Sequence, residues 1–105
     1  MHYACLNIED AVSFNWDDGN ILKNELKHNL SWQQIEELFF NEPLLLFKDE
    51  KHSDDTECRC AALGTIDDGT LITVIFTKRK NKIRVISARP MSKKERSFYE
   101  NYSTI

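Results

Sequence analysis

Two segments in the first half of the chain carry apolar residues at helical spacing. The first spans about residues 18–28, with Asp17 as its N-terminal cap and Asn29 ending it in a left-handed conformation. The second begins at Ser31, where Ser-Trp-Gln-Gln has the form of a capping box, and stops before Pro43. The pattern therefore predicts a pair of helices in the N-terminal half.

The second half changes to the apolar and polar alternation that is typical of strands. Asp67–Gly69 carries the Asp-Gly hairpin signal, and the polar residues Arg79–Asn81 mark a second turn. Ser92–Glu95 forms another capping box and starts a last helix that runs to about Tyr99. With two further short apolar runs, the expected strands cover residues 14–16, 44–47, 57–66, 70–77 and 82–88.

This order of elements predicts an α+β domain with an antiparallel meander. A length of 105 residues with 41% hydrophobic residues supplies one core, so we expect a single domain over 1–105. Residues 1–13 show no clear period and are treated as an N-terminal arm. No apolar run reaches the roughly 18 residues of a membrane span, and no secretory signal opens the chain.

The three cysteines are an odd number in a chain without a signal, which indicates free thiols and a cytoplasmic protein. The Cys58-Arg59-Cys60 spacing and the nearby His52 raise the question of a zinc site. Structural zinc takes four ligands, usually in paired spacings that this chain lacks, so we expect no metal and assign these cysteines to a buried strand. Nucleotide-binding and zinc-protease motifs are absent too, and no cofactor is predicted.

Charge divides the chain into two opposed halves. Residues 1–57 hold 4 basic and 13 acidic residues, a net charge of −9, whereas residues 58–105 hold 10 basic and 4 acidic residues, a net charge of +6. A basic half favours a polyanion or an acidic partner. Mutual neutralisation of the halves within one fold is the alternative.

The candidate chemistry is a set of cations that can hold a phosphate and neutralise charge during its attack. Lysines on the predicted first helix fit equally well as a solvated face, and His28 fits as a partner of the helix dipole. Arg84 is unusual within a strand unless it meets an anion or a carboxylate, and Glu57 is one such carboxylate. The set consists of Lys23, Lys27, His28, Arg59, the basic run Lys78–Lys82, Arg84 and Arg89.

Several motifs occur along the chain in a characteristic order and spacing. They are Phe14–Asp17, Asn24, Lys27-His28, Thr77–Arg79 and, most specific of all, Ile83–Arg89 followed by Glu95-Arg96. Together, over about Phe14 to Tyr99, they resemble the BrnT family.

The resemblance implies a RelE-like fold, in which two N-terminal helices pack on a curved antiparallel sheet with a short C-terminal helix. It also implies a type II toxin that cuts RNA without a metal, through attack of the ribose 2′-hydroxyl on the adjacent phosphate, and thereby inhibits translation. The implied partner is a BrnA-like antitoxin that binds operator DNA and joins two toxins and two antitoxins in one complex.

On this basis we assign two groups of site residues. The catalytic group is Lys27, His28, Arg59, Arg79, Arg84 and Arg89; the substrate-binding group is Lys23, Asn24, Lys78, Lys80 and Lys82. The chain has Asn20 where the family commonly has a lysine, and Asn29 and Lys80 where it has glycines. Two other functions stay open: a catalytically weak toxin scaffold that acts with its antitoxin in operator repression, and an RNA-binding module without cleavage.

Overall fold

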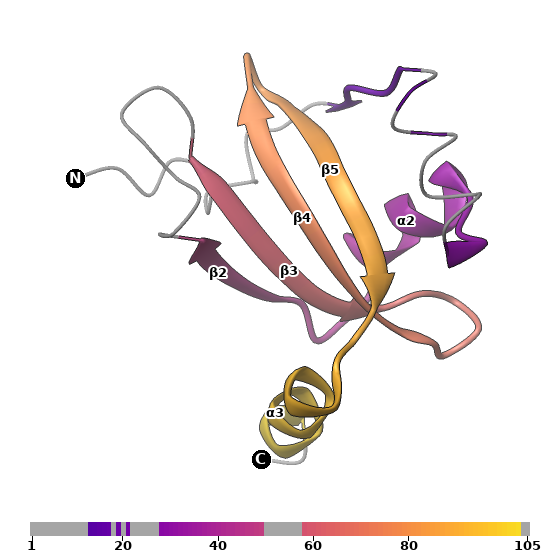
Figure 1. Ribbon diagram of the computed structural model, residues 1–105, viewed down its shortest axis with the longest axis vertical. Helices are drawn as coiled ribbons and strands as arrows, with labels where there is room; N and C mark the ends of the chain where they lie inside the picture. Colours follow the sequence, from indigo (N-terminus) through magenta and orange to yellow (C-terminus); the bar gives the residue numbers. More distant parts are fainter. Residues whose placement is uncertain (1–12, 18, 20, 22–27, 50–57, 104–105) are drawn as a thin grey trace.

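The computed structural model describes residues 13–17, 19, 21, 28–49 and 58–103. Figure 1 shows strands β2 to β5 side by side, with α2 to one side of them and α3 beyond the end at which β5 finishes. The sheet has five strands in the order β1-β5-β4-β3-β2. The elements are β1 (Ser13–Phe14), α2 (Trp32–Leu38), β2 (Leu45–Asp49), β3 (Arg59–Thr65), β4 (Leu71–Arg79), β5 (Lys82–Pro90) and α3 (Lys93–Ser103).

Most local signals in the sequence produce the expected elements. The Ser31 hydroxyl accepts from the backbone N–H of Gln34 while the Gln34 side chain accepts from the backbone N–H of Ser31, so the capping box at the start of α2 is confirmed. The capping box between Ser92 and Glu95 is confirmed in the same way at the start of α3. Gly69, with φ of +90°, turns the chain between β3 and β4 as the Asp-Gly signal predicts.

The predicted pair of N-terminal helices on an antiparallel sheet is wrong. The described residues hold one central helix, α2, and one C-terminal helix, α3, and the sheet is mixed because β1 pairs in parallel with β5. Antiparallel pairing is imposed by short hairpins, and β1 is separated from β5 by most of the chain, so no hairpin constrains its direction. The segment assigned to the first helix, 18–28, is described only at 19, 21 and 28.

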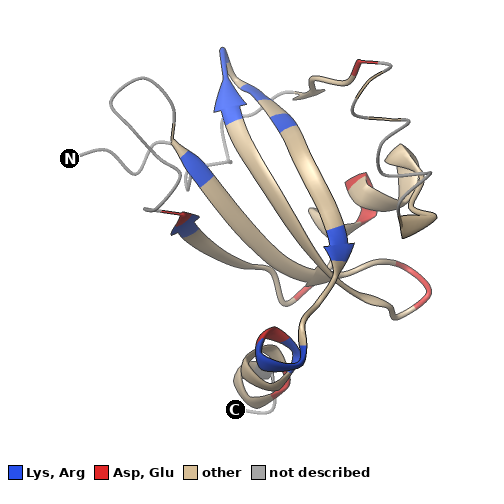
Figure 2. Ribbon diagram, viewed as in Figure 1, with Lys and Arg blue, Asp and Glu red and all other residues tan. Residues whose placement is uncertain are grey.

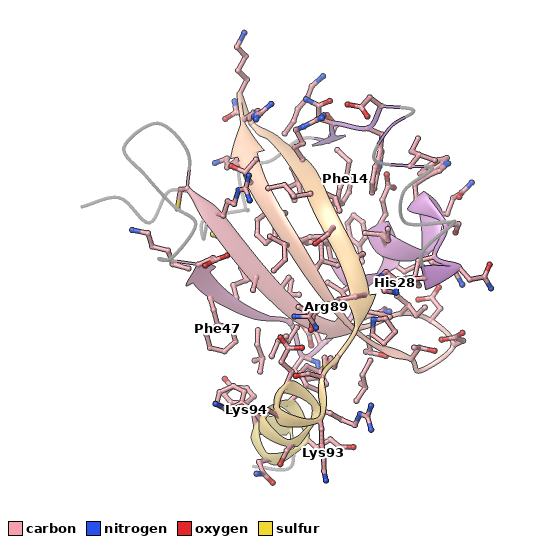
Figure 3. The ribbon with its side chains drawn as sticks, viewed as in Figure 1. Phe14, His28, Phe47, Arg89, Lys93 and Lys94 are labelled. Atoms are coloured by element: carbon pink, nitrogen blue, oxygen red, sulfur yellow. The ribbon has the colours of Figure 1, made fainter. Side chains whose placement is uncertain are left out.

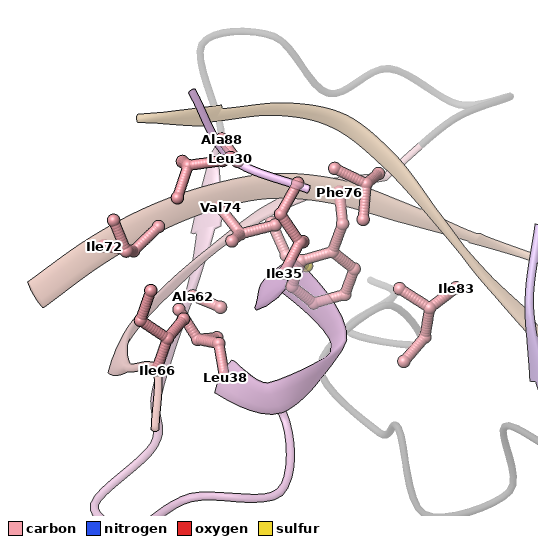
Figure 4. Packing of buried hydrophobic residues seen from close by; sticks show 12 residues of the cluster. Leu30, Ile35, Leu38, Ala62, Ile66, Ile72, Val74, Phe76, Ile83 and Ala88 are labelled. Carbon is pink, nitrogen blue, oxygen red and sulfur yellow. The ribbon is translucent and has the colours of Figure 1, made fainter. Parts of the chain in front are cut away.

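The main core lies between α2 and one face of the sheet (Figure 4). Ile35 and Leu38 of α2 are fully buried against Val74 and the other core side chains of β3, β4 and β5. A Cβ atom on Gly64 of β3 would lie 2.8 Å from the Leu38 Cγ atom, so α2 packs directly on the backbone there.

A second, smaller core lies on the opposite face of the sheet, which we call the outer face. It is formed by Leu45 of β2, Leu63 of β3, Met91 and Tyr99, with Leu71 packed against it. Tyr99 anchors α3 because its hydroxyl donates to the Pro43 carbonyl at 2.6 Å. The helix α3 therefore covers one end of the outer face.

The cysteines depart from expectation. Cys60 is fully buried on β3, as the sequence predicts for a small strand residue. Cys58 and Cys60 are both disulfide-bonded, however, so the prediction of free thiols is wrong for these two residues.

Candidate nucleic-acid interface

Cross-strand pairing brings two of the predicted arginines onto the outer face, on either side of one threonine. Thr77 of β4 pairs with Arg59 of β3 on one side and with Arg84 of β5 on the other. Directly paired residues share a face, and neighbouring strands are about 4.8 Å apart, so the two arginine backbones are separated by roughly 10 Å. Thr77 is buried and donates its hydroxyl to the Cys58 carbonyl at 2.9 Å.

The same face continues into a basic turn. Arg79 of β4 pairs with Lys82 of β5, and the two residues between them, Lys80 and Asn81, have φ values of 48° and 65°. Two positive φ angles define the type I′ turn that closes a two-residue hairpin. Lys78 pairs with the buried Ile83 and so belongs to the opposite face at this end.

Positive charge is concentrated at this end of the molecule. Figure 2 shows Lys and Arg gathered where β3 begins and β4 turns into β5, with a second group on the first turn of α3. Acidic residues appear on α2 and on the turn between β3 and β4, and also at the end of β2 and just after β1. The acidic and basic halves of the sequence are therefore not separated in space, because Asp17 and Asp49 of the acidic half lie beside Arg84 and Arg59 of the basic half.

Arg84 forms an ion pair with Asp17, which follows β1. Its Nη2 atom donates to the Asp17 Oδ2 atom at 2.7 Å, and the side chains are 25% and 50% exposed. Exposed ion pairs contribute little because water competes with them, typically about 0.2–1 kcal/mol. A phosphate can therefore exchange with this carboxylate, which leaves Arg84 available to a polyanion.

Arg89 is held much more firmly. It donates from Nη1 and Nη2 to both carboxylate oxygens of Glu95, at 2.6 Å and 2.9 Å, and Glu95 also accepts from the Thr73 hydroxyl and from the Ser92 backbone N–H. Figure 3 shows Arg89 on β5 next to the first turn of α3. The pair thus joins the end of β5 to the start of α3.

These contacts set the charge state of the pair. Hydrogen bonding from Arg89, opposed by partial burial, lowers the pKa of Glu95 to about 2, with further help from Ser92 and Thr73. The hydrogen bond to Glu95 likewise raises the pKa of Arg89. Glu95 is therefore an anion at neutral pH, and a carboxylate with so low a pKa is a poor proton acceptor.

The remaining predicted residues are not joined to the arginine row, the name we give to Arg59, Thr77 and Arg84 together with Arg79 and Lys82 at the adjoining turn. Lys23, Asn24 and Lys27 lie outside the described residues. His28 is half-buried beside α2 (Figure 3), and Leu30, two residues further on, is part of the main core against α2. Within the described residues, His28 therefore belongs to the α2 side of the sheet and the arginines to the outer face.

Sequence reasoning missed both carboxylate partners. It considered Glu57, which lies outside the described residues, whereas the observed partners are Asp17 for Arg84 and Glu95 for Arg89. Each partner was present in a local motif, Asp17 as a predicted helix cap and Glu95 in a capping box. A local motif gives no sign of a second, long-range contact, which is why these pairs were not found.

Metal-binding clusters and membrane-spanning helices are both absent from the described residues. No group of three or more His, Cys, Asp or Glu side chains there is placed to hold a metal ion. No helix there is both long enough and apolar enough to cross a membrane.

Comparison with known proteins agrees with the architecture. Residues 16–95 match the family model described as the ribonuclease toxin, BrnT, of a type II toxin–antitoxin system. The 1.1 Å crystal structure of the Brucella abortus ribonuclease toxin BrnT is similar to this chain with a TM-score of 0.58 and 24% sequence identity, over 78% of this chain and 99% of that one. No curated protein matched the sequence.

Proposed function

We propose that this chain, which belongs to the BrnT family of ribonuclease toxins of type II toxin–antitoxin systems, cleaves RNA bound along its outer face. The observation that carries the proposal is the pairing of Arg59, Thr77 and Arg84 across three strands, continued by Arg79 and Lys82 at the adjoining turn. Guanidinium groups match phosphate oxygens in a two-pronged geometry, so such a row can hold successive phosphates of a strand.

The proposed reaction is transesterification within the RNA. The 2′-oxygen of one ribose bonds to the adjacent phosphorus, the bond from that phosphorus to the 5′-oxygen breaks, and the products are a cyclic phosphate and a free 5′-hydroxyl. A base takes the proton of the 2′-hydroxyl and an acid protonates the 5′-oxygen. Arginines stabilise the pentavalent state, in which charge accumulates on the phosphoryl oxygens.

The residues divide between these tasks. Arg59, Arg79 and Arg84 supply cations. Lys27 and His28, the proton-transfer candidates from the sequence, are not placed on this face, since Lys27 lies outside the described residues and His28 lies on the α2 side of the sheet. Arg89 was assigned to the catalytic group from the sequence; we propose instead that its bidentate contact with Glu95 makes it a positioning residue that fixes α3 beside the face. The proposed substrate-binding residues at this end of the outer face are Lys80 and Lys82. Of the other residues assigned to substrate binding from the sequence, Lys78 belongs to the opposite face, and Lys23 and Asn24 lie outside the described residues.

Cleavage of a labelled single-stranded RNA in the presence of a chelator tests the proposal. We expect the intact chain to produce cyclic-phosphate and 5′-hydroxyl ends under these conditions. Arg84→Ala removes a charge-assisted contact worth about 1.5–3 kcal/mol, so cleavage should fall roughly 10- to 100-fold. Arg96→Ala, an exposed change on α3, is the matched control and should cleave normally. Activity that a chelator abolishes and a divalent ion restores would contradict metal independence.

The alternative is a catalytically weak scaffold that acts with its antitoxin in operator repression. It is favoured by the engagement of both Arg84 and Arg89 with carboxylates and by Asn20 in place of the usual lysine. Operator binding by the complex with no RNA cleavage by the purified toxin would select this alternative.

A protein partner follows from the family, since a type II toxin is paired with a protein antitoxin. We propose that this antitoxin is BrnA-like, that operator DNA is bound only through it, and that two copies of each protein form the complex. The RNA target places the proposed action in the cytoplasm, where it inhibits translation. Co-expression with the adjacent small gene, followed by native mass measurement, tests the composition, and a toxin that stays monomeric would contradict it.

A further inference from the structure

Two phenylalanine rings are exposed together at the margin of the outer face. Phe47 of β2 is 40% exposed and Phe98 of α3 is 49% exposed, and their rings meet edge to face with centroids 5.5 Å apart. Neither ring belongs to either buried core. Apolar side chains that are exposed together mark binding sites more often than single exposed ones do.

Cross-strand register connects Phe47 to the arginine row. Phe47 pairs with Ala61, and its neighbour two positions along β2, Asp49, pairs with Arg59. Two residues along a strand span about 6.6 Å, so the phenylalanine row and the arginine row are adjacent on the same face. The row that starts at Phe47 continues through Ala61, Ile75 and Ser87, which are half-buried.

The helix α3 adds a cation and a third ring. Lys94 and Tyr102 stand four residues before and after Phe98, a spacing that puts side chains on one side of a helix. Figure 3 shows Lys94 on the side of α3 that faces Phe47. Tyr102 is 53% exposed. We call Phe47, Phe98 and Tyr102 the aromatic patch; it has Lys94 on one side and the arginine row on the other.

We propose that the aromatic patch is a base-stacking subsite for single-stranded RNA whose phosphates lie on the arginine row. This inference rests on the proposed function and names the part of the substrate that the patch recognises. Single strands are bound by just this combination of a cationic track and aromatic rings, since every base offers a flat face for stacking. Continuity of the patch with the arginine row, and the cations on both sides of it, favour RNA over an apolar protein segment.

Binding to uncleavable RNA separates recognition from catalysis. The intact chain is titrated by fluorescence anisotropy with a 2′-O-methyl oligouridine and with an oligomer of equal length and charge that lacks its bases. Stacking contributes about 1–3 kcal/mol per base, so we expect a preference for the base-bearing strand of roughly 5- to 150-fold. Phe98→Ala and Phe47→Ala should weaken binding of that strand and remove the preference, without changing binding of the abasic strand.

Two further variants make the result specific. Phe40→Ala removes a ring that is 78% exposed outside the outer face, so it should bind both oligomers as the intact chain does. Phe98→Trp keeps a stacking surface and should restore the preference. Circular dichroism checks that each variant is folded.

The outcomes divide clearly. An intact chain that binds both oligomers equally, or neither, overturns the subsite, and so do phenylalanine variants with unchanged RNA binding. If the variants lose affinity for the co-expressed antitoxin alone, the patch belongs to that protein and the proposal is wrong. If the intact chain prefers the base-bearing strand but does not cleave unmodified RNA, the stacking subsite is supported and the proposed nuclease function is contradicted.

Discussion

The substitution Glu95→Gln tests the bidentate ion pair between Arg89 and Glu95. The Glu95 carboxylate accepts four hydrogen bonds: two from Arg89, one from the Thr73 hydroxyl and one from the Ser92 backbone N–H. It also lies in the first turn of α3, where a negative charge is favoured by the helix dipole. Glutamine keeps the shape and one acceptor oxygen but removes the charge and the bidentate contact.

The size of the effect follows from the pKa of Glu95. A decrease from 4.5 to about 2 corresponds to about 3 kcal/mol at 1.36 kcal/mol per pH unit. Solvent screening reduces this figure, because the Arg89 side chain is 39% exposed and that of Glu95 is 26% exposed. We therefore expect Glu95→Gln to lower the free energy of unfolding at pH 7 by about 1–2 kcal/mol.

The pH dependence identifies the cause. Because the pKa of Glu95 is lower in the folded state, its contribution is complete above pH 4.5 and is lost as the pH falls towards 2. Urea unfolding at pH 7 and at pH 2.5 should show a difference between the intact chain and the variant that is large at pH 7 and much smaller in acid. Glu100→Gln is the same change at an exposed position of α3. It should cause a smaller loss of stability at pH 7 and a smaller change of that loss with pH. A variant as stable as the intact chain at pH 7, or a difference that persists in acid, would refute the reasoning.

Three further substitutions test the packing and the turns. Gly64→Ala should destabilise the protein by about 1–3 kcal/mol, measured by urea unfolding, because the new Cβ would lie 2.8 Å from the fully buried Leu38 side chain. Lys80→Gly should raise the free energy of unfolding by about 0.5–1 kcal/mol and so raise the thermal midpoint, since φ at this residue is 48° and glycine adopts this angle without strain. Tyr99→Phe should cost about 1 kcal/mol in urea unfolding by removing the hydrogen bond to the Pro43 carbonyl. If any of the three variants has the same unfolding midpoint as the intact chain, the structural reason given for that variant is wrong.

Local chemistry predicted much of the fold because its signals are short-range. Both capping boxes and the Asp-Gly turn specify backbone hydrogen bonds within a few residues, and each forms as expected. The parallel pairing of Phe14 with Ile83 has no such signal, since the two segments are far apart in sequence and no turn joins them. The direction of β1, and with it the mixed character of the sheet, therefore could not be predicted from the pattern.

The candidate site shows the same division. Alternation along β3, β4 and β5 is enough to put Arg59 and Arg84 on one face once the strands are paired, although the register itself came only from the structure. The partner of Arg89 was hidden because Glu95 already had a local explanation as the last residue of a capping box. The exposed pair of Phe47 and Phe98 joins a strand to a helix, so no periodicity within either element could reveal it.

The parallel pairing of β1 with β5 also has a consequence for folding during synthesis. Strands β2 to β5 each pair with their neighbour in sequence, so they can associate as they emerge from the ribosome. Phe14 has to wait for Ile83, and at 5–20 residues per second this delay is roughly 3–14 s. The contact between Arg84 and Asp17 depends on the same late event, because it joins the two strands that meet last. The edge strand β1, which borders Arg84 on β5, therefore joins the sheet only after Ile83 has been made.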